Sequence, residues 1–184
     1  RGNAADFGDL TTSVDLAAGT SNSVRGITAG GRTPSMSNVI QYVTMASTGN
    51  ATDFGDLTQS RMQVTGMGSP TRAVFAGVTM GAYDGGQTGP VDFLTIASQG
   101  NMINYGDLSV TRIGTGGTGN SVRAVMMGGQ NASGNAVNTI DFGIIANGGT
   151  FTDFGDMTGV RGSKTVQVSD SHGGLNDGYQ GTRP

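Results

Sequence analysis

A short motif with paired aspartates recurs along the chain, and its residue types could bind a metal ion. It reads Asp-Phe-Gly-Asp-Leu or a close variant and starts at residues 6, 53, 104 and 153. The pairs include Asp53 with Asp56 and Asp153 with Asp156. Carboxylates are the hard ligands that calcium takes, but no Asp-rich loop supplies the six or more oxygens such a site needs. We therefore expect these aspartates to cap turns and to pair with arginines, and we expect no bound metal.

Two features of the sequence could suggest catalysis, but the other residues that such catalysis requires are missing. Asp-Phe-Gly is the magnesium-binding triplet of protein kinases, yet the other kinase motifs, such as the His-Arg-Asp loop, are missing. His172 is the only histidine, and one histidine defines no catalytic triad. Its place nineteen residues after an anchor motif is filled by arginine in the other units. We expect a protein that is not an enzyme and needs no cofactor.

Two series of arginines keep a fixed distance from this motif, which we call the anchor; a unit runs from one anchor to the next. Nineteen residues after the start of the anchor come Arg25, Arg72 and Arg123. Eight residues after it come Val14, Arg61, Arg112 and Arg161. A guanidinium can make two parallel hydrogen bonds to a carboxylate, or bond to backbone carbonyls. We expect the first series to bind a neighbouring repeat, the alternative being a ligand-facing role in a channel.

The composition limits the class of protein. Only 12% of the 184 residues are charged, 34 are glycine, and the net charge is −3 with no glutamate and one lysine, Lys164. Glutamate and lysine favour helix surfaces, whereas Asp, Asn, Gly and Thr favour turns and strands. No basic patch with interleaved aromatics supports nucleic-acid binding. Unbroken apolar runs stop at four residues, too short to insert into a membrane.

The spacing of the anchors, 47, 51 and 49 residues, predicts a repeat architecture. Each unit contains apolar, β-branched or aromatic runs bounded by turn residues, which is the pattern of strands. The expected strands are residues 23–29, 71–76 and 121–127, then 38–45, 91–96 and 137–145, then the anchors, and a short one at 63–65 with its equivalents. A glycine four residues before each later anchor suits a tight turn, and the anchor glycine suits a close backbone approach.

Four short strands per repeat of about 49 residues favour an all-β fold in which four-stranded sheets stack on one another. A β-propeller fits best, because the coils of the competing β-solenoid usually need about half this period. The expected divisions are an anchor strand at 4–10, blades at 11–58, 59–109 and 110–158, and a partial blade at 159–184. Residue 1 is Arg, and we expect an excerpt or processed product. The partial blade indicates a larger propeller, or a neighbouring chain that supplies the missing strands.

The order of features in each unit resembles the kelch repeat: a glycine pair, a variable loop, an aromatic, then aromatic-x-x-Leu and arginine. Phe54, Tyr105 and Phe154 stand where kelch repeats usually have tryptophan. The phrase from residue 38 to residue 58 resembles more specifically the kelch-like repeats of virion structural or tail-fibre proteins of marine bacteriophages. The resemblance covers nearly the whole chain. It implies a virion or extracellular location and an adhesive or structural role, with other virion subunits as partners.

Variation in length falls in one place, between the glycine pair and the aromatic, which marks an exposed loop. The loops are residues 32–38, 79–90 and 130–137. Their Gly, Ser, Thr, Asn and Tyr content suits adaptable polar contacts with a host surface or glycan. The candidate binding residues are Tyr83, Asp84 and Gln87. The alternative is a purely structural module that binds only other protein subunits.

Overall fold

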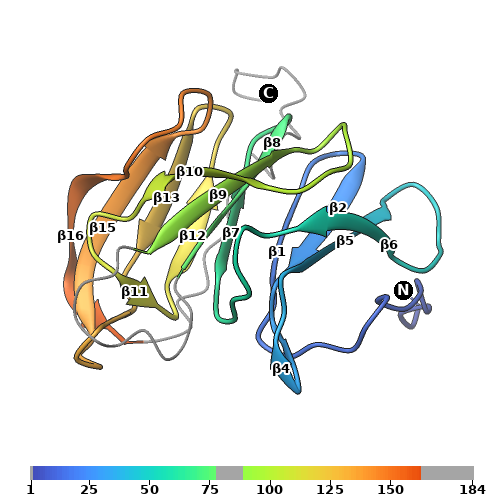
Figure 1. Cartoon of the computed structure of the whole chain (residues 1–184), viewed down its shortest axis with the longest axis horizontal. Coiled ribbons are helices and arrows are strands. Elements are labelled where there is room, and N and C mark those ends of the chain that lie inside the picture. Colours follow the sequence, from blue (N-terminus) through green and yellow to red (C-terminus); the bar gives the residue numbers. More distant parts are fainter. Residues whose placement is uncertain (1, 78–88, 163–184) are drawn as a thin grey trace.

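The computed structural model describes residues 2–77 and 89–162, and all regular structure in these residues is β-strand. The strands form three four-stranded antiparallel sheets and two short two-stranded ones (Figure 1). The expected all-β fold is confirmed. Each large sheet keeps its strands in chain order, so each is built from consecutive hairpin-like connections.

The bounds of the strands follow the sequence units. Sheet 1 contains β1 (Ala18–Ser21), β2 (Arg25–Ala29), β5 (Val39–Thr44) and β6 (Thr52–Asp56). Sheet 2 contains β7 (Thr65–Gly68), β8 (Arg72–Ala76), β9 (Pro90–Thr95) and β10 (Ile103–Asp107). Sheet 3 contains β12 (Gly116–Gly119), β13 (Arg123–Met127), β15 (Val137–Ile144) and β16 (Thr152–Arg161). The small sheets pair β3 (Arg32–Thr33) with β4 (Ser35–Met36), and β11 (Arg112–Ile113) with β14 (Gln130–Asn131).

The second and third strands of each sheet pair in the same register. The opposed residues are Ile27 with Tyr42, Val74 with Phe93, and Val125 with Phe142. An aliphatic residue opposite an aromatic one is a favourable cross-strand pair, worth about 0.2–1 kcal/mol. The sequence repeat is therefore also a structural repeat, residue by residue.

The anchor lies on the outermost strand of each sheet, and its aromatic residue is the extra residue of a β-bulge. In sheet 1, Asp53 pairs with Gln41 and Gly55 pairs with Ile40, which leaves Phe54 between them. Tyr105 and Phe154 occupy the same place in sheets 2 and 3. A bulge bends the strand and re-aims the side chain. Here the bulge turns the aromatic side chain of the anchor out of the alternating pattern of side chains along the strand.

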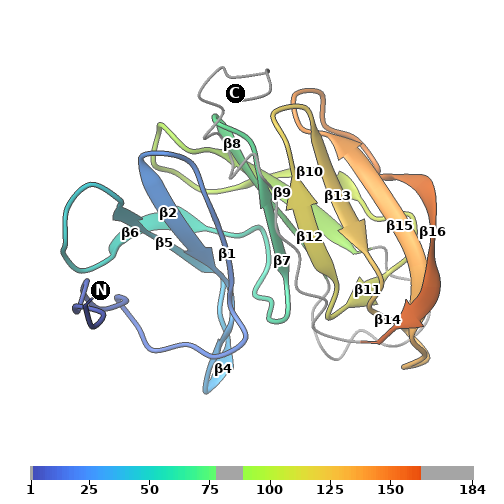
Figure 2. The same ribbon diagram turned by 180° about the vertical axis from the view of Figure 1, so that it is seen from behind.

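The sheets stack through their innermost strands, with β1 against β7 and β7 against β12 (Figure 2). Glycine makes this contact possible, because a Cβ on Gly66 would lie 2.4 Å from the carbonyl oxygen of Gly19. A Cβ on Gly117 would lie 2.2 Å from a methyl of Thr65. The innermost strand of sheet 2 runs from residue 65 to 68, so the strand expected at 63–65 begins two residues too early.

Apolar side chains fill the two spaces between the sheets. One cluster joins the face of sheet 1 that carries Ile27, Ile40 and Phe54 to sheet 2. A second cluster joins the other face of sheet 2, with Val74 and Tyr105, to sheet 3. Each sheet thus has a front face toward the next sheet in the chain and a back face toward the preceding one. Within the described residues the three sheets do not close into a ring.

The first anchor differs from the others. Residues 4–10 were expected as a strand but form no strand ladder. The backbone carbonyls of Phe7 and Asp9 are instead bonded to the N–H groups of Gly49 and Ala51, in the turn before β6. The first anchor lies along the back of sheet 1.

Candidate functional site

Within the described residues, the recurring contact between an anchor and the next sheet brings together the largest set of bonded polar groups. We call each such contact a junction. The first joins residues 6–16 to sheet 1, the second joins sheet 1 to sheet 2, and the third joins sheet 2 to sheet 3.

Backbone hydrogen bonds connect the anchor of each junction to a turn of the next sheet. Gly100 and Met102 donate their N–H groups to the carbonyls of Phe54 (2.9 Å) and Asp56 (2.8 Å). The side chain of Asn101 accepts the N–H of Asp56 at 3.0 Å. The first junction has the same bonds from Gly49 and Ala51 to Phe7 and Asp9, and the third has those from Gly149 and Phe151 to Tyr105 and Asp107.

The anchor glycine is required by this contact. Gly8, Gly55 and Gly106 have φ values of 143°, 142° and 155°, a region that favours glycine. A Cβ at any of them would lie 2.3–2.5 Å from the backbone of the glycine in the facing turn. Any other residue would push the turn away.

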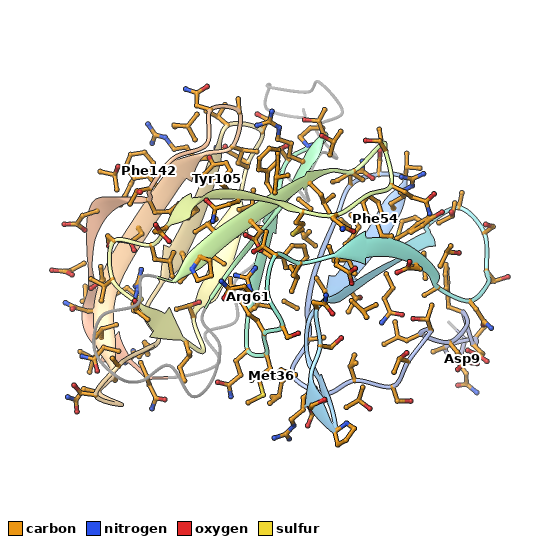
Figure 3. The ribbon with its side chains drawn as sticks, in the orientation of Figure 1. Asp9, Met36, Phe54, Arg61, Tyr105 and Phe142 are labelled. Carbon is orange, nitrogen blue, oxygen red and sulfur yellow. The ribbon has the colours of Figure 1, made fainter. Side chains whose placement is uncertain are left out.

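A buried arginine follows the anchor in the second junction and inserts into the next sheet. The Arg61 side chain is fully buried, in the middle of the molecule (Figure 3). Its Nη1 donates to the carbonyls of Pro90 (2.7 Å) and Gly77 (3.1 Å), and its Nη2 donates to a carboxylate oxygen of Asp92. Desolvation lowers the pKa of the Arg61 guanidinium from its ordinary value, while the facing Asp92 raises it. Starting from so high a value, the group stays charged at neutral pH.

The third junction repeats this arrangement. Arg112, fully buried, donates from Nη1 to the carbonyls of Thr139 (2.7 Å) and Gly128 (3.1 Å), and from Nη2 to Asp141. Burial again lowers the pKa of the guanidinium, and Asp141 opposes the shift. Removing one partner of a buried ion pair costs about 3–5 kcal/mol, because the other charge is left unpaired in a medium of low dielectric constant.

The arginine also contacts the sheet behind it. The carbonyl of Arg61 accepts the N–H of Gly31, two residues after the end of β2 in sheet 1, at 2.8 Å. Thr58, three residues earlier, donates its hydroxyl to Asp92 at 2.6 Å. The segment from 58 to 61 is therefore bonded to the backbone of one sheet and to the buried carboxylate of the next.

The first junction has the same geometry without the charges. Val14 stands where the other junctions have arginine, and Gln41 stands where they have aspartate. Gln41 is buried, and its Oε1 accepts both the N–H and the hydroxyl of Thr11 at 2.7 Å. The first junction thus has a neutral residue in place of both the arginine and the aspartate, although Val14 and Gln41 lie 27 residues apart in the chain.

The other arginine series reaches across the junctions near their outer side. Arg25 lies over the Tyr42 ring, 4.7 Å from its centroid, and donates to the carbonyl of Ile96 in sheet 2 at 2.5 Å. Arg72 lies 4.6 Å from the Phe93 centroid and donates to Ile145 of sheet 3 at 2.8 Å. Arg123 lies 5.1 Å from the Phe142 centroid. Each of these arginines makes a cation–π contact with an aromatic ring of its own sheet. Arg25 and Arg72 also donate hydrogen bonds to backbone carbonyls of the next sheet.

The anchor aspartates do not pair with these arginines. The ion pairs of the described residues are Arg61–Asp92, Arg112–Asp141 and the exposed Arg32–Asp15. The carboxylate of Asp153 instead accepts the N–H of Gly155 at 3.0 Å, a local turn bond. The expected capping is present there. The expected pairing of Asp53, Asp56, Asp153 and Asp156 with arginine is wrong within the described residues, because the guanidinium groups bind Asp15, Asp92 and Asp141 or backbone carbonyls instead. Asp153 forms no ion pair with Arg112, although its charge helps to raise the pKa of that guanidinium.

Sequence reasoning missed the carboxylates that the arginines do bind. Asp92 and Asp141 each stand twelve residues before an anchor, and Gln41 holds that position in sheet 1. A signal was available, since a charge between two apolar residues in a buried strand, as in Val91-Asp92-Phe93, needs a partner. The candidate binding residues Tyr83, Asp84 and Gln87, together with His172, lie outside the described residues.

The back face of sheet 1 is open. A hollow of about 380 Å³ lies over β1, β2 and β5 and is lined by residues that include Leu10, Thr28 and Val43. In sheets 2 and 3 the residues equivalent to Thr28 are Phe75 and Met126, both buried by the preceding sheet. The face of sheet 1 that corresponds to the covered faces of sheets 2 and 3 is thus a hollow.

Within residues 2–77 and 89–162, no three His, Cys, Asp or Glu side chains come together as metal ligands would. No helix in this part of the chain is long and apolar enough to cross a membrane. The chain matches no protein-family model and no curated protein.

Proposed function

We propose that the three sheets are consecutive blades of a kelch-like β-propeller and that the chain is a non-enzymatic virion component, of a tail fibre or the virion surface, that attaches to a host surface. The sheets keep one register and one set of junction contacts, whereas the connections between the second and third strands differ in length. A fixed core with variable loops is the arrangement of proteins that bind through their loops.

The single observation that carries the attachment role is the position of these connections. The β3–β4 hairpin and the β11–β14 pair lie at the same end of their sheets (Figure 2). The loop at 130–137 is held by its own polar groups, since Asn131 accepts the N–H groups of Ser133 and Asn135 at 3.0 Å. The hairpin is held by the exposed Arg32–Asp15 pair, whose hydrogen bond lowers the pKa of Asp15. Loops preorganised in this way lose little entropy on binding.

The test is binding of the full chain to a glycan array and to host-envelope extracts. Attachment through the loops predicts that Tyr83→Ala and Ser133→Arg each weaken binding at least tenfold, about 1.4 kcal/mol. Val122→Ser, an exposed position outside the variable loops, serves as the matched control and should leave binding unchanged. Equal loss in all three variants, or no binding to any extract, would contradict the proposal.

A second candidate function is a module that joins subunits of an assembly and binds only protein. It is favoured by the apolar front face of sheet 3, where Phe154 is 55% exposed. A cryo-EM map of the native particle separates the two. Loops that face outward support attachment, and loops buried against other subunits support assembly.

A further inference from the structure

We propose that the front face of sheet 3 is a docking surface for one more four-stranded sheet of the same repeat, and that Arg161 selects a sheet that carries a buried aspartate on its third strand. This inference does not depend on the attachment role. It follows from comparing sheet 3 with sheets 1 and 2, whose equivalent faces are covered.

The apolar part of this surface is identified by its counterparts. Ile27, Ile40 and Phe54 of sheet 1 are each at most 2% exposed, because sheet 2 covers them. The equivalent residues of sheet 2, Val74, Val91 and Tyr105, are covered by sheet 3. In sheet 3 the same positions are Val125, Ile140 and Phe154. They are all at least partly exposed, so the face has the composition of a core without its covering layer.

The hydrogen-bonding groups of a junction are also present on sheet 3. The carbonyl of Arg161 accepts the N–H of Gly129 at 2.8 Å, as the carbonyl of Arg61 accepts that of Gly31. The backbone of Arg161 is thus placed as in the complete junction, but its side chain is exposed, and among the described residues its Nη1 donates only to the carbonyl of Val160. The Arg123 guanidinium lies over the Phe142 ring. The described residues contain no further sheet whose carbonyl it could bind.

The anchor glycine gives an independent sign of the missing partner. Gly155 has φ 135°, as its equivalents do, yet a Cβ there would meet nothing within 4 Å. At Gly55 and Gly106 the facing turn lies within 2.5 Å of such a Cβ. Sheet 3 therefore keeps the strained backbone that admits the glycine of a facing turn, as Gly55 admits Gly100 and Gly106 admits Gly149.

The back face of sheet 1 in a second copy of this chain cannot be the occupant. Its turn is already bonded to the first anchor, through the carbonyls of Phe7 and Asp9. It also offers Gln41, whose Oε1 is used by Thr11, where Arg161 needs a carboxylate. The occupant is instead a sheet like sheets 2 and 3, with an unoccupied turn, an apolar back face and an aspartate equivalent to Asp92 and Asp141.

The test is a lengthened chain in which a second copy of residues 113–161 is inserted directly after Arg161, with all other residues kept. The copy brings an equivalent of Asp141 opposite Arg161. We expect amide hydrogen exchange in residues 152–161 to slow about tenfold, toward the rates of β6 and β10. We also expect Arg161→Val to lower the Tm of the lengthened chain by several degrees while leaving the Tm of the original chain unchanged.

The matched control is Asp141→Asn in the inserted copy only, which should weaken docking and remove the effect of Arg161→Val. Unchanged exchange in 152–161, or an equal effect of Arg161→Val with and without the insertion, would overturn the proposal. Should the lengthened chain fail to fold, sedimentation of the original chain decides. A dimer that Phe154→Asp dissociates would show that a second copy of the chain occupies this face, and it would refute the proposal. A monomer whose amide hydrogens exchange faster in β16 than in β6 and β10 would support it.

Discussion

The first and second junctions have the same backbone hydrogen bonds, but the second contains a buried ion pair where the first has neutral side chains. The second buries Arg61 against Asp92, and the first places Val14 and Gln41 at these positions. Since the anchor and turn hydrogen bonds are alike in both, the ion pair is not needed to form a junction. Buried ion pairs often add little net stability, because desolvation offsets their attraction. The comparison indicates that the ion pair adds selectivity for the facing side chain to a junction whose backbone bonds form without it.

Removing one charge should break the second junction and give the largest effect. Asp92→Ala leaves the Arg61 guanidinium buried without its carboxylate, which we expect to lower the free energy of unfolding by about 3–5 kcal/mol. Urea denaturation measures this change. The control is the double variant Arg61→Met with Asp92→Leu, expected to lose much less. Equal losses in both would mean that the pair stabilises the fold rather than specifying neighbours.

The anchor glycines test the backbone part of the comparison. Gly55→Ala should cost about 2–3 kcal/mol, since it adds a clash with the facing turn to the strain of a positive φ. Gly155→Ala, with the same φ but no facing turn, should show the strain alone, about 1 kcal/mol. Thermal unfolding of the two variants supplies the difference. A loss at Gly155 as large as that at Gly55 would contradict the open face of sheet 3.

Charging the first junction would sharpen the comparison. Val14→Arg and Gln41→Asp should each destabilise the protein alone, because each introduces a charge without a partner. Together they should recover part of the loss, with a coupling energy of about 1–3 kcal/mol in a double-mutant cycle. Additive effects would show that residues 11–15 cannot adopt the path of residues 58–62.

The smallest expected effect concerns pH. Desolvation raises the pKa of the Tyr105 phenol above its ordinary value of 10.0, and its hydroxyl donates to the carbonyl of Ile144. A raised pKa in the folded state gives stability that is present below pH 10 and is lost as the pH rises through the folded-state pKa. Unfolding free energies at pH 8 and above 10 should therefore diverge in the native chain more than in Tyr105→Phe. An identical pH dependence would remove Tyr105 from the explanation.

Fixed spacing was enough to predict most strands. The paired runs at 23–29 and 38–45 are β2 and β5 within two residues, because β-branched and aromatic residues alternate there. The innermost strands were displaced, since β7 reads Thr-Gly-Met-Gly and glycine normally argues against a strand. Its glycines are needed for the close contact with β1 and β12, which no local pattern reveals.

The junction chemistry was only half visible in the sequence. The arginine series stood out by spacing, but its partners did not, because Asp92 lies 31 residues after Arg61 and only folding brings them together. The anchor aspartates drew attention because they recur in pairs, and pairing with the arginines was expected as the alternative to calcium binding. The joint occurrence of Val14 and Gln41 can be explained only by the contact between the equivalent residues, Arg61 and Asp92.

The two-sided bonding of Arg61 has a consequence for how such a chain can grow in evolution. Every segment that starts just after one arginine and ends at the next, such as residues 62–112, contains an aspartate for the arginine before it and an arginine for the aspartate after it. Duplication or exchange of a gene fragment with these end points keeps every charge paired. A fragment cut at the borders of a sheet separates an arginine from the segment that positions it. Recombination that respects the arginines can therefore change the number of sheets at little cost in folding.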